Sequence, residues 1–299
     1  MTTTIAVAGA TGNMGGRIVA ALIGRGANVR ALVRAGATGD KIAKLKQQGL
    51  EVVRVDMADP SALAAACAGA SCVVSALLGL RDVIVDAQSV LVDAAAAAGV
   101  PRFIPSDYSI DFTKLAGGGN RNLDWHSEFR AHLVKTPIAS TSILTGMFAD
   151  LLLYGTPLLD RKAKRVSYWG DADQRMDFTT MDDTAKFTAA AALDPSAPAI
   201  LCAVGDRITA RELAGVAGDV DKTPYELVCA GTVDDLTALI KRVRDASPES
   251  EAENFPRWQG MQYSRDMFDG RALLEPLAND RYPDLKWTSI RALLSAPRR

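Results

Sequence analysis

The amino-acid sequence predicts an α/β protein built on a doubly wound parallel sheet. Short apolar, β-branched runs alternate with segments of helical spacing over the first half of the chain. Strands separated by helices cannot be joined by tight hairpins, so they lie parallel with helices on both faces. The alternation becomes irregular after about Leu153, which predicts a smaller C-terminal α/β region.

The sequence predicts the positions of the individual helices and strands. Helices are expected near 18–22 and 41–48, after Asp59-Pro60, and as a long segment from about Val83. Six strands are expected, at 4–8, 29–33, 51–55, 72–75, 102–104 and 141–144.

The length predicts two domains, since one domain takes roughly 150 residues. We place a nucleotide-binding domain at 1–150 and a smaller substrate-binding region at 151–299, with helices near 180–191 and 211–217. The acidic stretch 245–253 is expected to be a solvated loop.

Composition limits the classes of partner. The net charge of -1 gives no overall attraction to nucleic acid or to an anionic membrane. Four cysteines without CxxC spacing indicate thiols in a reducing compartment. No signal peptide is expected, and the apolar run 94–100 is too short to span a bilayer. We expect a soluble, cytoplasmic protein, for which a homodimer is compatible with the sequence.

A glycine-rich turn joins the first expected strand to the first helix. Gly9, Gly12 and Gly15 give the spacing G-x-x-G-x-x-G. Glycines permit a tight turn and let backbone N–H groups approach a pyrophosphate at a helix N-terminus. The turn is also compatible with a purely structural role, but its place at the start of an alternating chain favours a Rossmann-type dinucleotide site.

The end of the second strand indicates which dinucleotide is bound. An acidic residue there bonds the ribose 2′-hydroxyl of NAD, whereas an arginine accommodates the 2′-phosphate of NADP. This chain has Arg34, followed by Lys41, and no Asp or Glu between Gly15 and Gly39. The alternative is that both cations are solvated surface charges. The pattern favours NADP(H).

The chain resembles the NmrA-like and isoflavone-reductase-like branch of the atypical short-chain dehydrogenases. The segments that show this resemblance are residues 9–15, 33–34, 40–41, 73–75, 102–107 and 282–288. The resemblance implies NADPH lying over the strand ends, which the switch-point rule for doubly wound sheets selects as well. The cofactor-binding residues that follow are Gly9, Thr11, Gly12, Asn13, Met14, Gly15, Arg34, Lys41, Asp56, Met57, Ser75, Leu77, Leu78, Pro105 and Ser106.

The catalytic pattern departs from that of related enzymes. The one Tyr-x-x-x-Lys match, Tyr282 to Lys286, lies near the C-terminus and contains Pro283, so we interpret it as structural. The reductase branch carries a lysine on the helix after the fifth strand, and this chain has His126 at that position. A histidine titrates near neutrality and can donate a proton, although the change equally fits a loss of catalysis.

Other side chains complete the expected site. Tyr108 follows the fifth strand and is a second candidate proton donor, or a residue that packs by its ring. His126 and His132 lie six apart on different helix faces, without carboxylates at metal-ligand spacing, so no metal is expected. An apolar substrate pocket is expected from Trp125, Met147, Phe148, Tyr154, Trp258 and Met261, although each is also a common core residue.

These features predict an NADPH-dependent reductase that passes hydride to a small apolar or aromatic carbonyl or conjugated compound. One alternative is a non-catalytic NADP(H)-sensing regulator, which the altered lysine position favours. A sugar-nucleotide epimerase or dehydratase is a third option, and the misplaced Tyr-x-x-x-Lys pattern argues against it.

Overall fold

A six-stranded parallel sheet organises the first part of the chain. The structure is a computed structural model that describes residues 3–297. The strand order is β3-β2-β1-β4-β5-β6, and every neighbouring pair is parallel. This order confirms the doubly wound, Rossmann-type fold and places the reversal of strand order between β1 and β4. The strands are β1 Thr4–Ala8, β2 Asn28–Arg34, β3 Glu51–Val55, β4 Cys72–Ser75, β5 Arg102–Ile104 and β6 Ala139–Ser140.

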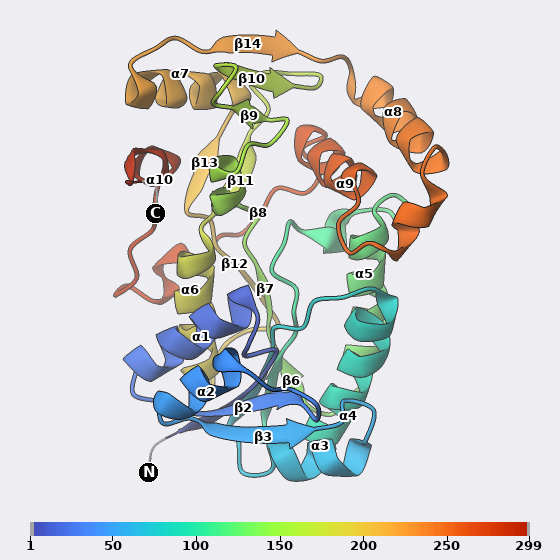
Figure 1. The fold of residues 1–299 in the computed structure, drawn as a ribbon, viewed down its shortest axis with the longest axis vertical. Coiled ribbons are helices and arrows are strands. Elements are labelled where there is room, and N and C mark those ends of the chain that lie inside the picture. The colour runs from blue at the N-terminus through green and yellow to red at the C-terminus, as the bar shows by residue number, and fades with distance from the viewer. Residues whose placement is uncertain (1–2, 298–299) are drawn as a thin grey trace. The chain divides into compact units, whose positions relative to one another are not determined.

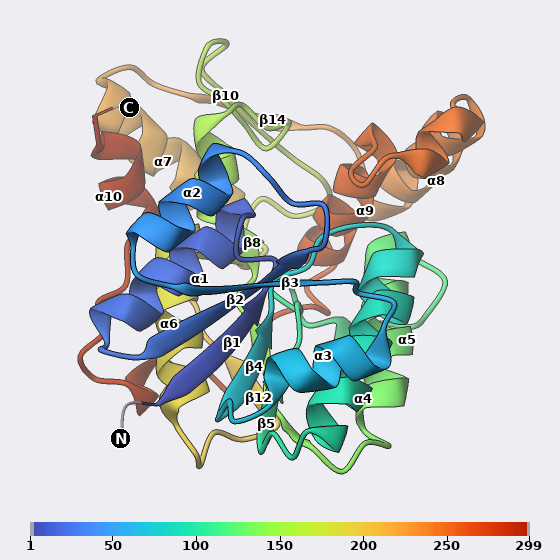
Figure 2. The same cartoon turned by 60° about the horizontal axis from the view of Figure 1, so that its bottom comes forward.

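Helices cover both faces of this sheet, so its central strands are buried on both sides (Figure 2). Residues 5–8 of β1 are fully buried. Helices α3, α4 and α5 lie on one face, where Phe103 of β5 packs on Phe129 of α5 with ring centroids 6.3 Å apart. The helices are α1 Asn13–Gly24, α2 Asp40–Gln47, α3 Pro60–Cys67, α4 Gln88–Ala97, α5 Arg121–Leu133 and α6 Met181–Leu193.

Two expected elements differ in detail from the structure. The long helix expected from Val83 begins as a π turn, η1 (Asp82–Ala87), before α4. The strand expected at 141–144 is divided, because β6 ends at Ser140 and β7 (Ser142–Leu144) pairs instead with β12 (Ile200–Cys202). The division of the strand comes from a pairing partner, β12, that is distant in sequence.

The chain forms two compact units that interleave along the sequence. The first comprises the residues up to Tyr108, Trp125–Ile143 and Thr184–Leu201. The second comprises Ser109–Asp124, Leu144–Asp183 and the chain from Cys202 onward. The boundary expected near residue 150 divides the chain only once, whereas the chain passes between these units several times.

The second unit contains two small mixed sheets and several helices (Figure 1). One sheet has the order β14-β10-β9 and the other β13-β11-β8. Its strands are β8 Met147–Phe148, β9 Leu159–Asp160, β10 Arg165–Tyr168, β11 Met176–Thr179, β13 Asp206–Ile208 and β14 Glu226–Cys229. Its helices include α7 Ala210–Asp221, α8 Val233–Asp245, α9 Arg257–Phe268 and α10 Ile290–Ser295, with the short turns η2 Phe112–Lys114, η3 Ala149–Leu153, η4 Pro248–Ala252 and η5 Asn279–Arg281.

The acidic stretch 245–253 is more ordered than expected. It is largely exposed, but it contains the 3-10 turn η4, in which Ser250 is buried and accepts a hydrogen bond from Trp258 Nε1 at 2.9 Å. Glu251 forms ion pairs with Arg121 and Arg244. The segment is therefore largely exposed, as expected, but partners elsewhere in the sequence hold it.

Within residues 3–297, no helix has the length and apolar character needed to cross a membrane. The same residues contain no group of three or more His, Cys, Asp and Glu side chains arranged to hold a metal ion.

Candidate functional site

The glycine turn lies between β1 and α1, packed against the backbone that follows β4. Gly9 has a φ of +82°, and a Cβ at this position would lie 2.4 Å from the carbonyl oxygen of Ala76. A Cβ on Gly15 would lie 2.1 Å from the carbonyl oxygen of Gly9. Both distances are impossible for a real side chain. The fold itself therefore requires glycine at these two positions, in addition to any requirement of a ligand.

The turn leaves the N-terminus of α1 open. Gly12 is the N-cap residue, no side chain caps the helix, and its first turn holds no acidic residue. Gly12 and Asn13 are exposed, while Thr11 and Met14 are half-buried beside them. Uncapped N–H groups and the positive end of the helix dipole together favour an anion. The turn is therefore suited to a pyrophosphate.

Basic side chains gather at the ends of β2 and β3. Arg34 is the last residue of β2, Lys41 is the second residue of α2, and both are exposed. Arg54 of β3 donates from Nε to the carbonyl of Ala37, at 3.3 Å, in the loop between Arg34 and Lys41. Arg54 carries no functional signal in the sequence, since strand pairing alone brings it to this loop.

The segments after β4 and β5 are bonded to each other. Ser106 Oγ donates to the carbonyl of Leu77 at 2.7 Å, and Tyr108 Oη donates to the carbonyl of Ser75 at 3.1 Å. Leu78 is 64% exposed. The expected cofactor-lining residues of β4 and β5 thus lie together at the carboxyl edge of the sheet.

The remaining expected cofactor residues lie beside these segments. Asp56 is exposed and accepts from the backbone N–H of Ala58 at 3.0 Å. Met57 packs against the core of the sheet, and Pro105 is buried.

A buried carboxylate lies against His126 on α5. Nδ1 of His126 is 3.0 Å from Oδ1 of Asp107, which follows β5. Asp107 is fully buried and His126 is 8% exposed. Oδ2 of Asp107 has no hydrogen-bond partner among the described residues. Asp107 has no distinctive signal in the sequence beyond its place in the run 105–108, which the family resemblance places at the nicotinamide.

Tyr108 lies next to Asp107 and is held in its neutral form. Burial, with a smaller contribution from the charge of Asp107, raises the pKa of Tyr108 well above its usual value. Because its hydroxyl proton is also directed at the carbonyl of Ser75, the phenol is a poorer proton donor than a histidine.

His132, also on α5, forms a second histidine–aspartate pair with Asp93 of α4. Its Nε2 is 2.9 Å from Oδ1 of Asp93, and the two side chains are 40% and 54% exposed. This pair is bonded through Nε2, whereas His126 is bonded through Nδ1, and it is exposed to solvent. It therefore serves as a control for the buried pair of His126 and Asp107.

The residues expected to line a substrate pocket are distributed over both units, so their common pocket stays a prediction. Trp125 belongs to the first unit and is half-buried. In the second unit, Tyr154 is 82% exposed beside a surface depression of about 440 Å³. Met147 and Phe148 form β8, and Met261 on α9 is half-buried.

Trp258 is enclosed by two guanidinium groups. Its indole is 1% exposed, and the guanidinium carbons of Arg121 and Arg244 lie 4.6 Å and 4.5 Å from the ring centroid. These contacts make Trp258 a core residue of the second unit.

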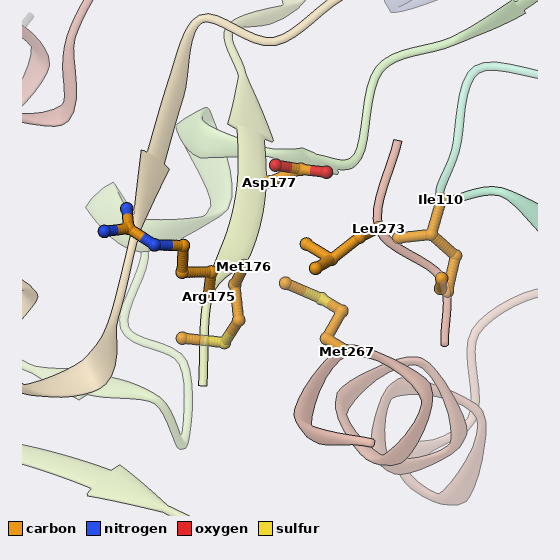
Figure 3. A pocket seen from close by; sticks show the side chains of 7 residues that line it. Ile110, Arg175, Met176, Asp177, Met267 and Leu273 are labelled. Carbon is orange, nitrogen blue, oxygen red and sulfur yellow. The ribbon is translucent and has the colours of Figure 1, made fainter. Parts of the chain in front are cut away.

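A cavity in the second unit is too small for an organic ligand (Figure 3). Its volume is about 10 Å³, with Met176, Met267 and Leu273 in its wall. Asp177 at its edge is already bonded to Nε of Arg207, at 2.6 Å, and to the backbone N–H of Leu274. Such a volume accommodates about one water molecule.

Comparison with known proteins gives a consistent result. Residues 1–217 match the model of the NmrA-like family. Pinoresinol reductase 2 of Arabidopsis thaliana is 31% identical over 209 residues, which are 64% of this chain and 65% of that protein. The match thus spans less than two thirds of that relative's length.

Two solved structures share the fold. AtPrR2 with NADP+ and (+)pinoresinol superposes with a TM-score of 0.82, at 23% identity, and covers 99% of this chain and 98% of that one. The leucoanthocyanidin reductase–NADPH complex from Vitis vinifera gives a TM-score of 0.78, at 20% identity, over 97% of this chain and 98% of that one. Since the matching family model covers more than half of the sequence, the chain belongs to the NmrA-like family.

Proposed function

We propose that this protein is an NADPH-dependent reductase that passes hydride to an electrophilic carbon of an apolar, aromatic carbonyl or conjugated compound. The observation that carries the proposal is His126, a nearly buried imidazole against a buried carboxylate, next to the strand ends of a dinucleotide-type sheet. The reductase relatives, which include pinoresinol reductase 2, support the same chemistry.

The residues at the sheet edge fit NADPH. Gly9 and Gly15 let the turn pack closely, and α1 begins behind it without a side-chain cap, so the first N–H groups of the helix would hold the pyrophosphate. Arg34 and Lys41, with Arg54 beside them, would hold the 2′-phosphate. Ser75, Leu77 and Ser106 would line the nicotinamide. When bound, NADPH supplies the hydride.

His126 supplies the proton that balances the reaction. The acceptor gains a hydride on carbon and a proton on the atom that develops negative charge, which together make a two-electron reduction. The protonated imidazole of His126 donates that proton and becomes neutral. Tyr108 is less suited to this step, since its hydroxyl is directed at the carbonyl of Ser75.

Stopped-flow absorbance at the NADPH band tests the proposal. We expect oxidation of NADPH in a single turnover with at least one member of a panel of aromatic carbonyl and conjugated compounds, beginning with pinoresinol. A folded protein that binds NADPH and oxidises it with none of them contradicts the proposal. That result would favour the non-catalytic NADP(H)-sensing regulator.

Arg34→Ala is expected to weaken NADP+ binding while leaving NAD+ binding unchanged. A hydrogen bond to a charged group contributes about 1.5–3 kcal/mol, which corresponds to a rise in Kd of roughly 10–100-fold. Isothermal titration with both coenzymes measures the change. Lys46→Ala is the control, since this exposed cation lies on the same helix as Lys41 without a place in the site. An equal loss for NADP+ and NAD+ would contradict a 2′-phosphate site at Arg34.

A further inference from the structure

We propose that Asp107 is a positioning residue that fixes the proton-bearing nitrogen of His126. Its carboxylate accepts the Nδ1–H, so Nε2 is the nitrogen that exchanges a proton with the acceptor. The inference rests on the proposed function, in which His126 is the proton donor, and it assigns the role of the residue behind it.

The burial of the pair makes this hydrogen bond strongly directional. Asp107 is fully buried, and its Oδ1 lies 3.0 Å from Nδ1 of His126. A buried carboxylate is costly unless it accepts hydrogen bonds, and its Oδ2 has no partner among the described residues. The Nδ1–H of His126 therefore compensates a carboxylate that otherwise faces a large desolvation penalty. This coupling holds the imidazole in one tautomer and one ring orientation.

The residues on both sides of Asp107 are hydrogen-bonded to neighbouring elements. The N–H of Ser106 donates to Oε1 of Gln88 on α4, at 3.0 Å, and its hydroxyl donates to the carbonyl of Leu77. On the other side, Tyr108 is bonded to the carbonyl of Ser75. Since both flanking residues are anchored to the segment after β4 or its helix, the carboxylate of Asp107 is held in place before any ligand binds.

The proton transfer from His126 to the acceptor balances when Asp107 holds the Nδ1–H. The imidazolium carries protons on both nitrogens, and the proton on Nε2 passes to the acceptor while the Nδ1–H stays bonded to Asp107. The resulting neutral imidazole regains a proton at Nε2 from water. Asp107 remains a carboxylate throughout, in the manner of the aspartate in a Ser-His-Asp triad.

The pair of His132 and Asp93 provides a matched control. Its histidine lies on α5, as His126 does, but this histidine is bonded through Nε2 to Asp93 of α4, and both side chains are exposed. An exposed pair of this kind contributes little, so its removal leaves activity unchanged.

Nitrogen NMR of histidine-labelled protein tests the tautomer without relying on activity. The chain contains two histidines, so two sets of ring signals are expected, and His132→Gln assigns them. In the wild type, with the imidazole in its neutral form, we expect His126 to carry its proton on Nδ1. Asp107→Asn, whose amide can donate to Nδ1, should move that proton to Nε2 or mix the tautomers, whereas Asp93→Asn should change only the signals of His132. A wild-type His126 with its proton on Nε2 overturns the proposal whatever the activity.

Single-turnover kinetics test the catalytic consequence. Asp107→Asn should slow hydride transfer by about 10–100-fold, the range found for residues that orient a metal-ligating histidine. The Kd for NADP+ should not change, and the Tm should stay close to that of the wild type. Asp93→Asn should react at the wild-type rate. An unchanged rate in Asp107→Asn overturns the positioning role. If the wild type reduces no acceptor, the proposed function fails, and the NMR experiment still decides whether Asp107 sets the tautomer.

Discussion

Gly15→Ala is expected to abolish NADP+ binding and to destabilise the first unit. The new Cβ would lie 2.1 Å from the carbonyl oxygen of Gly9, and the atoms it meets belong to the backbone, so no side-chain rotation relieves the clash. Overpacking of this kind costs about 1–3 kcal/mol and occasionally more, and opening the turn removes the pyrophosphate position at the start of α1. We expect a Kd for NADP+ raised at least ~100-fold and a lower Tm.

Gly16→Ala is the matched control for this change. It lies next in the sequence, within α1, and its Cβ would meet the carbonyl oxygen of Ala10 at 3.6 Å, an ordinary contact. Alanine in a helix interior is more favourable than glycine by about 0.5–1 kcal/mol, so this variant should keep its Tm and its affinity. Equal behaviour of the two variants in calorimetry and thermal unfolding would show that the packing of the turn does not govern binding.

His126→Gln is expected to slow hydride transfer by about 100-fold or more, because general acid catalysis contributes at least that much when a positioned donor neutralises developing charge. The glutamine amide can still donate to Asp107, so the buried carboxylate keeps a partner and the fold is preserved. The rate of NADPH oxidation in a single turnover measures the effect, and the Kd for NADPH should not change.

Two further variants make this prediction specific. His126→Lys places at this position the lysine that the reductase branch carries, and we expect it to retain a measurable part of the rate. His132→Gln, on the same helix, should behave as the wild type. A wild-type rate for His126→Gln would exclude His126 as the proton donor and leave Tyr108 as the candidate.

The cofactor side of the site depends mainly on local sequence. Gly9 and Gly15 belong to a turn whose conformation is set within a few residues, and Arg34 ends a strand whose apolar pattern is plain in the sequence. The same local signals gave strands β1, β3, β4 and β5 at their observed bounds. The sequence did not indicate that β6 would end at Ser140 or that the next strand would pair with β12, because pairing depends on distant residues.

The proton-donating part of the site could be predicted from the sequence only in part. His126 stood out because it replaces a lysine, but its partner Asp107 lies 19 residues earlier, and an acid after a strand is usually a solvated loop residue. Arg54 was missed for the same reason, since the register between β2 and β3 carries it to the loop of Ala37.

The sequence by itself determined the parallel α/β sheet, the glycine turn and the basic end of the second strand, because hydrophobic periodicity and turn chemistry act over a few residues. Only the tertiary structure decided the strand order, the interleaving of the two units and the burial of Asp107 against His126. These features depend on packing between segments that are far apart in the chain, so no local sequence pattern indicates them. In the buried pair, the loss of solvent strengthens the hydrogen bond between the two side chains.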